Sequence, residues 1–131
     1  MEINNLSRYL RKPTQYICVQ VSYRSRTSAN QVLLNDLKYW LESIMSENGE
    51  VHLDKDGYFC GPHLIKCCTG TKEECKRVQA KERFHRQAYG STSRLVQLGM
   101  WRDSWLILPA DENGNWVPTM SMIKKALDII L

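Results

Sequence analysis

The sequence lacks the features that mark exported and membrane-spanning proteins. Its first residues, MEINNLSRYLRKP, contain neither an apolar core segment nor a small-residue cleavage site, so we expect no secretory signal. The longest apolar runs, such as Trp105 to Pro109, are far too short to cross a bilayer. The five cysteines are an odd number, which fits free thiols better than a disulfide framework. These absences predict a cytoplasmic protein with no membrane partner.

Familiar enzyme signatures are also missing. The chain has no Gly-rich phosphate-binding loop, no G-x-S-x-G turn around a nucleophilic serine and no H-E-x-x-H pair. Asp54 and Asp56 lie together in D-K-D-G, where aspartate is expected for turn geometry. We therefore expect a binding protein rather than an enzyme, and we expect no cofactor.

What the sequence does contain is an ordinary globular composition with unevenly placed positive charge. Its 131 residues are enough for one domain, residues 1–131, and too few for two. The net charge is +4; residues 1–26 carry five basic and one acidic side chain, and residues 67–94 carry seven basic and three acidic ones. If folding brings these two segments together, their patch is large enough to hold several phosphates.

The order of predicted elements is that of an α+β domain. Gln15 to Arg24 alternates with β-branched residues on one side, which predicts a central strand. Ser28 and Gln31 form a capping box that opens a helix with leucines at helical spacing. Residues 50–68 resemble a β-meander, residues 104–110 predict an apolar strand, and residues 119–130 predict an extra C-terminal helix. Residues 91–101 fit a helical turn or a strand equally well.

The simplest arrangement of these elements is a single antiparallel or mixed sheet with the helices packed on one face. Among such folds we favour the split βαβ topology of ferredoxin-like domains. That fold hosts many functions, so it identifies none by itself.

The most informative segment is Thr71 to Tyr89, which predicts a helix opened by a second capping box, Thr71 with Glu74. Five side chains at i, i+4, i+7, i+11 and i+14 share one narrow face of this helix. They are Lys72, Lys76, Gln79, Arg83 and Arg86, which we call the basic stripe. No acidic residue interrupts the stripe, so we expect it to bind an external polyanion or an acidic protein surface. A solvated helix face is the alternative.

We accordingly predict a nucleic-acid-binding module whose basic stripe contacts phosphates, with Arg24, Arg26 and Arg94 as flanking contacts. RNA and DNA both remain open as partners. The alternative is a phage or mobile-element accessory protein whose stripe meets an acidic surface and inhibits a host protein complex.

A metal-independent ribonuclease is a further alternative. His85 and Tyr89 are i, i+4 neighbours on the basic helix, and with Arg86 or Arg94 they could supply the acid, base and cation that RNA cleavage needs. Small bacterial ribonuclease toxins use groups of this kind on compact α+β scaffolds.

Cysteine and histidine spacing allows a zinc site, although the pattern matches no common zinc motif. The candidate ligands are Cys60, His63, Cys67 or Cys68, and Cys75. Adjacent strand positions point to opposite faces, so Cys67 and Cys68 cannot both join one site. Buried cysteines that act as small apolar residues are the simpler interpretation, and we predict no metal.

Ser91-Thr92-Ser93, together with Arg24 at a strand end, resembles the Ser-Thr-Ser and arginine elements of some ADP-ribosyltransferases. That family's Glu-x-Glu or Gln-x-Glu is absent, and Glu112, in a predicted turn, is a poor substitute. A polar loop after Gly90 explains the same residues.

Overall fold

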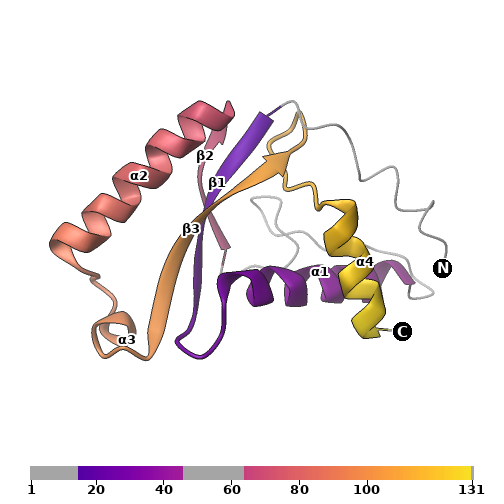
Figure 1. Cartoon of the computed structure of the whole chain (residues 1–131), viewed down its shortest axis with the longest axis horizontal. Helices are drawn as coiled ribbons and strands as arrows, with labels where there is room; N and C mark the ends of the chain where they lie inside the picture. The colour runs from indigo at the N-terminus through magenta and orange to yellow at the C-terminus, as the bar shows by residue number, and fades with distance from the viewer. Residues whose placement is uncertain (1–14, 46–63, 131) are drawn as a thin grey trace.

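The computed structural model describes residues 15–45 and 64–130. In it, a three-stranded antiparallel sheet has the strand order β2-β1-β3 (Figure 1). The strands are β1 (Gln15–Arg24), β2 (Leu64–Gly70) and β3 (Trp101–Ala110). The helices are α1 (Ala29–Met45), α2 (Lys72–Tyr89), α3 (Arg94–Gln97) and α4 (Met120–Ile130). The α+β class, the antiparallel sheet and the extra C-terminal helix are therefore confirmed.

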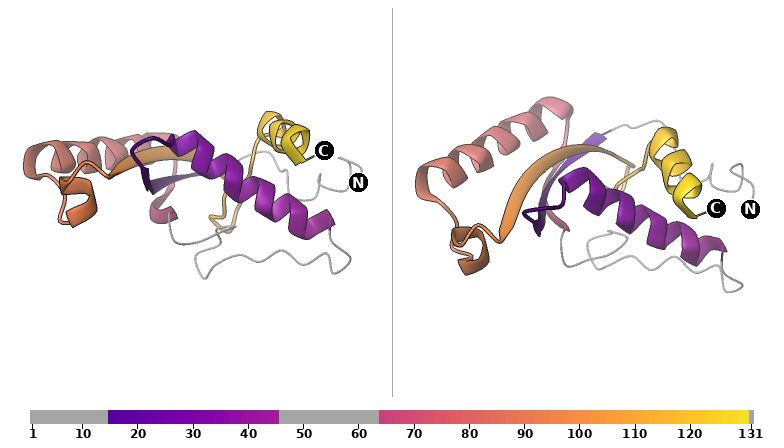
Figure 2. Two further views of the ribbon diagram at one scale, coloured as in Figure 1. Left: turned by 90° about the horizontal axis from the view of Figure 1, so that it is seen from below. Right: turned by 60° about the horizontal axis from the view of Figure 1, so that its bottom comes forward.

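Helices cover both faces of this sheet, so the prediction that they share one face is wrong. α1 and α4 lie on one side and α2 lies on the other (Figures 1 and 2). The physical reason is that β1 is apolar on both sides. Ile17, Val19 and Val21 pack against α1 and α4, whereas Cys18 packs beneath α2, and all four are fully buried. The ferredoxin-like topology, in which both crossover helices cover one face, is not confirmed.

The larger core lies between the sheet and the α1–α4 layer. Ser28 caps α1, because its Oγ accepts a hydrogen bond from the backbone N–H of Gln31 at 3.1 Å. The predicted apolar face of α1 is confirmed for Leu33, Leu34, Leu37, Trp40 and Leu41. From α4, the core receives Ile123, Ala126 and Leu127. This core fixes α1 and α4 to one face of the sheet and leaves the opposite face for α2.

The ambiguous segment 91–101 contains both elements, the short helix α3 and then the first residue of β3. β3 pairs with the whole length of β1, from Gln15 opposite Ala110 to Arg24 opposite Trp101. The turn after β3 is closed by Asp111, whose Oδ1 accepts hydrogen bonds from the backbone N–H groups of Asn113 and Asn115, both at 2.9 Å. After this turn, the chain returns to β3 through an isolated bridge between Ala110 and Trp116.

The first strands of the predicted β-meander, at residues 50–60, lie outside the described residues. Among the helices that are described, none is both long and apolar enough to traverse a bilayer.

Candidate nucleic-acid interface

α2 forms where the sequence predicts it, and its ends show why. Thr71 Oγ1 accepts a hydrogen bond from the backbone N–H of Glu74 at 3.1 Å, which satisfies one of the free amides of the first turn. At the other end Gly90 adopts φ 71° and donates its N–H to the Arg86 carbonyl at 2.9 Å. The helix lies across the face of the sheet opposite α1 (Figure 2).

The orientation of α2 turns much of the basic stripe toward the sheet. Cys75 is fully buried against Cys18 and Trp105, so the face that contains it is the inner one. Gln79 and Arg86 lie on the same side of the helix, and both are partly buried. Lys72, on the neighbouring flank, places its Nζ 5.7 Å from the centre of the Tyr16 ring. The stripe therefore has internal partners that the sequence did not indicate.

Two stripe residues bind the outer edge of β3. Gln79 Nε2 and Arg83 Nη2 donate to the Trp105 carbonyl oxygen at 2.6 and 3.3 Å. The Pro109 carbonyl, at an equivalent position along the strand, accepts from Val117 N–H on the side away from β1, so the Trp105 carbonyl faces that side too. The helix thus satisfies a carbonyl on what is, among the described strands, an edge of the sheet.

The expectation that the stripe has no acidic partner is wrong for Arg86. Its Nη2 lies 2.7 Å from Oδ2 of Asp103, whose side chain is only 5% exposed. Ser22 donates its hydroxyl to the other oxygen of Asp103 at 2.7 Å, and the Arg86 guanidinium lies 5.4 Å from the centre of the Trp105 ring. Arg86 therefore holds α2 against β1 and β3, and its charge is largely neutralised within the fold.

The cations that remain on the surface of α2 outnumber its exposed carboxylates. The exposed basic side chains are Lys72, Lys76, Arg77, Lys81 and Arg83. Of the two exposed glutamates, Glu73 lies 3.7 Å from Lys76, and Glu74 completes the cap with Thr71. Arg77 and Lys81, which lie outside the stripe, have no carboxylate partner in the part of the chain that the structure describes.

Further arginines gather at the end of the sheet where α2 terminates. Ser25 donates its backbone N–H to the Met100 carbonyl at 3.1 Å and its hydroxyl to the Gly99 carbonyl, which joins the β1–α1 turn to the start of β3. Around this junction the predicted flanking residues Arg24, Arg26 and Arg94 are exposed, as is Arg102. Three arginines that were predicted to contact phosphates therefore lie at one end of the domain, and Arg102 lies there with them.

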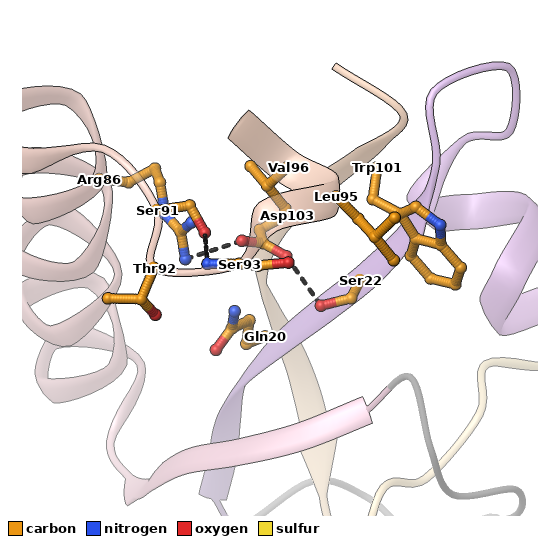
Figure 3. Close-up of a pocket in the computed structure, with 10 residues that line it drawn as sticks. All are labelled: Gln20, Ser22, Arg86, Ser91, Thr92, Ser93, Leu95, Val96, Trp101 and Asp103. Atoms are coloured by element: carbon orange, nitrogen blue, oxygen red, sulfur yellow. Dashed lines mark hydrogen bonds and ion pairs between the residues drawn. The ribbon is translucent and has the colours of Figure 1, made fainter. Parts of the chain in front are cut away.

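A cavity of about 250 Å³ opens beneath the C-terminal end of α2 (Figure 3). Its lining is Gln20, Ser22, Arg86, Ser91, Thr92, Ser93, Leu95, Val96, Trp101 and Asp103. The Ser22–Asp103–Arg86 network forms its floor, and the loop between α2 and α3 forms a wall (Figure 3). Gln20, Ser22 and Asp103 were not among the predicted site residues, although polar residues within the apolar strand β1 were a signal for the first two.

His85 and Tyr89 do not form part of this cavity. Their rings lie 5.4 Å apart on the flank of α2, and both side chains are exposed, Tyr89 to 78%. Arg86, their proposed cationic partner, is bound to Asp103 instead. Arg94 is then the remaining cation proposed beside them, and the ribonuclease alternative stays a prediction.

The cysteines lie on and near the inner face of α2. Cys68 and Cys75 have their sulfur atoms 3.8 Å apart, and Cys67 is exposed, as expected for adjacent strand positions. Burial raises the pKa of Cys18 to about 12 and that of Cys75 to about 11, which keeps both thiols protonated at neutral pH. Cys60 and His63 lie outside the described residues, and the residues that are described contain no group of three or more side chains suited to hold a metal ion.

No protein-family model, curated protein or solved structure matches this chain.

Proposed function

We propose that the protein is a cytoplasmic nucleic-acid-binding module that contacts phosphates through α2 and the adjoining end of the sheet. One observation carries this proposal, the excess of positive charge on α2 and around its C-terminal end. Residues 64–102, which include α2 and α3, carry nine basic and three acidic side chains, and an ion pair with Asp103 neutralises one of the nine. Such an excess of exposed positive charge attracts a polyanion.

The placement of the exposed cations suits an extended phosphate backbone. α2 has 18 residues and is therefore about 27 Å long, and exposed basic side chains occur along it from Lys72 to Arg83. Arg94 and Arg102 continue the positive surface beyond its C-terminal end. Contacts of this kind position a strand without reading its sequence, so they predict affinity that falls steeply with salt.

The test replaces two exposed cations that make no side-chain hydrogen bond or ion pair with the described residues. Arg77→Gln with Lys81→Gln removes two charges from α2, and Lys124→Gln with Lys125→Gln removes two equally exposed charges from α4. Binding of labelled single-stranded RNA and duplex DNA is then measured by fluorescence anisotropy. At about 0.1 M salt, the α2 variant should bind roughly ten- to thirtyfold more weakly, because each phosphate contact contributes about 0.7 to the slope of log affinity against log salt for a single strand.

The α4 variant is the matched control and should bind like the parent protein. Equal losses of nucleic-acid affinity in the two variants would show that affinity depends only on the net charge of the protein and not on the position of the cations. Absence of binding to either nucleic acid at low salt would refute the proposal.

A protein partner is the second candidate function, favoured by an exposed apolar cluster at the α3 end. Leu95, Leu98 and Met100 are 45%, 55% and 56% exposed and lie beside Arg94 and Arg102. Arginine and methionine around an apolar centre are typical of protein interfaces. If an inhibitor or adaptor role is correct, Leu98→Asp will abolish capture of a protein partner and leave nucleic-acid affinity unchanged.

A further inference from the structure

We infer that the cavity beneath the end of α2 receives one unpaired nucleobase of the bound strand. The inference rests on the proposed function and goes beyond it, because it assigns a base-recognition site to a surface that otherwise contacts only phosphates. The observations behind it are the size of the cavity, the unused side-chain amide of Gln20, and the near-neutral charge of the cavity floor.

The cavity is small and partly polar. At about 250 Å³ it falls below the range of roughly 300–1,000 Å³ that is usual for drug-sized ligands, so it suits a group the size of a single base. Leu95, Val96 and Trp101 contribute apolar surface on one side of it. A flat ring with a polar edge can use both kinds of lining at once.

Two side chains in this cavity have hydrogen-bonding atoms that nothing in the described fold uses. Nη1 of Arg86 is buried and has no hydrogen-bond partner, although Nη2 of the same guanidinium binds Asp103. The side-chain amide of Gln20 also has no partner among the described residues, and Figure 3 shows it facing the space beside Arg86 and Thr92. Nη1 of Arg86 has almost no accessible surface, so Gln20 is the residue that offers a ligand in the cavity a free donor–acceptor pair.

An amide of this kind fits the edge of a nucleobase, where a donor lies beside an acceptor. A glutamine amide can pair with both at once. A base that supplies both partners to the otherwise unused amide gains affinity over one that does not.

A phosphate fits the cavity less well than a base does. The Asp103 carboxylate is 95% buried beside Arg86 and neutralises the only cation in the lining. A phosphate placed there would meet this carboxylate with no further positive charge to offset it. The phosphates instead have the exposed cations of α2 and Arg94 at the rim, which would hold the backbone while a base turns inward.

The experiment compares the affinities of labelled (rU)8, (rA)8 and (rC)8, an (rU)8 with one central guanosine, and an abasic eight-residue strand. We expect one base to bind at least five- to tenfold more tightly than the others, within the range for a paired hydrogen-bond contact. The abasic strand should keep the salt dependence of the others but bind as weakly as the least favoured base. This comparison uses the unmodified protein and does not depend on how any variant folds.

Gln20→Met keeps the length of the side chain and removes its hydrogen bonds, and Gln87→Met makes the same change on the exposed surface of α2. The first variant should lose the base preference and keep the salt slope; the second should change neither. Equal affinity for all strands, including the abasic one, would overturn the base site while leaving the phosphate interface intact. Arg77→Gln with Lys81→Gln should lower the salt slope and keep the base preference, and no binding of any strand at low salt would overturn both proposals.

Discussion

Replacing Arg86 with methionine is expected to destabilise the fold by about 3 kcal/mol at neutral pH, because it leaves a buried carboxylate without its counter-charge. The Asp103 side chain is 5% exposed and lies 2.7 Å from the guanidinium. Breaking such a pair costs about 3–5 kcal/mol when both partners are buried. Arg86 is 28% exposed, which places the estimate at the lower end. Methionine keeps the apolar stem but loses the contact with the Trp105 ring, which contributes about 0.5–1 kcal/mol of this cost.

The partner substitution shows whether the buried charge is the cause. Asp103→Asn removes the charge and keeps an oxygen that can accept from the Ser22 hydroxyl. The double variant Arg86→Met with Asp103→Asn should therefore be more stable than Arg86→Met alone, with a coupling free energy of about 2 kcal/mol. The assay is equilibrium unfolding in urea, with the slope on denaturant compared across all four proteins. Additive effects, or a loss below about 0.5 kcal/mol for Arg86→Met, would refute the reasoning.

Other predictions concern the cap, a turn and the thiols. Thr71→Ala should cost about 1 kcal/mol in urea unfolding because α2 loses its N-cap, and no change would mean that the cap is not needed. Gly114→Ala should cost at least about 1 kcal/mol in the same assay, because Gly114 has φ 78° and a new Cβ would lie 3.3 Å from a neighbouring side chain; an unchanged midpoint would contradict this. Burial raises the pKa of Cys18 to about 12 and that of Cys75 to about 11. The two protonated thiols therefore contribute fully to the free energy of unfolding below about pH 9. As the pH rises toward 11–12, this free energy should fall by up to about 1.4 kcal/mol per pH unit for each thiol. In Cys18→Ala, the free energy of unfolding measured in urea should fall less steeply with alkaline pH than in the parent protein. Iodoacetamide at neutral pH should label exposed Cys67 before the two buried thiols, as read by mass spectrometry, and equal labelling would contradict their burial.

Local patterns predicted the elements of this fold well. The capping boxes at Ser28 and Thr71 are both present, and the apolar spacing of α1 identified its buried face. These signals act within a few residues of the chain, so they can be read without knowing the tertiary structure.

The arrangement of the elements was harder to predict because it depends on contacts between distant residues. Strand β1 looked one-sided, but Cys18 on β1 and Trp105 on β3 make the second face of the sheet apolar enough to hold α2. The basic stripe looked unpartnered because its carboxylate, Asp103, comes from another element of the fold. The cavity exists only where α2, α3 and two strands meet, so no single segment could have predicted it.

The most direct test of the central claim is the slope of log affinity against log salt for single-stranded RNA. If the exposed cations of α2 contact phosphates, the slope should become shallower by about 1.4 in Arg77→Gln with Lys81→Gln, because two contacts of about 0.7 each are lost. The slope of Lys124→Gln with Lys125→Gln should stay at the parent value. An unchanged slope in the α2 variant, or no RNA binding at low salt, would contradict the account.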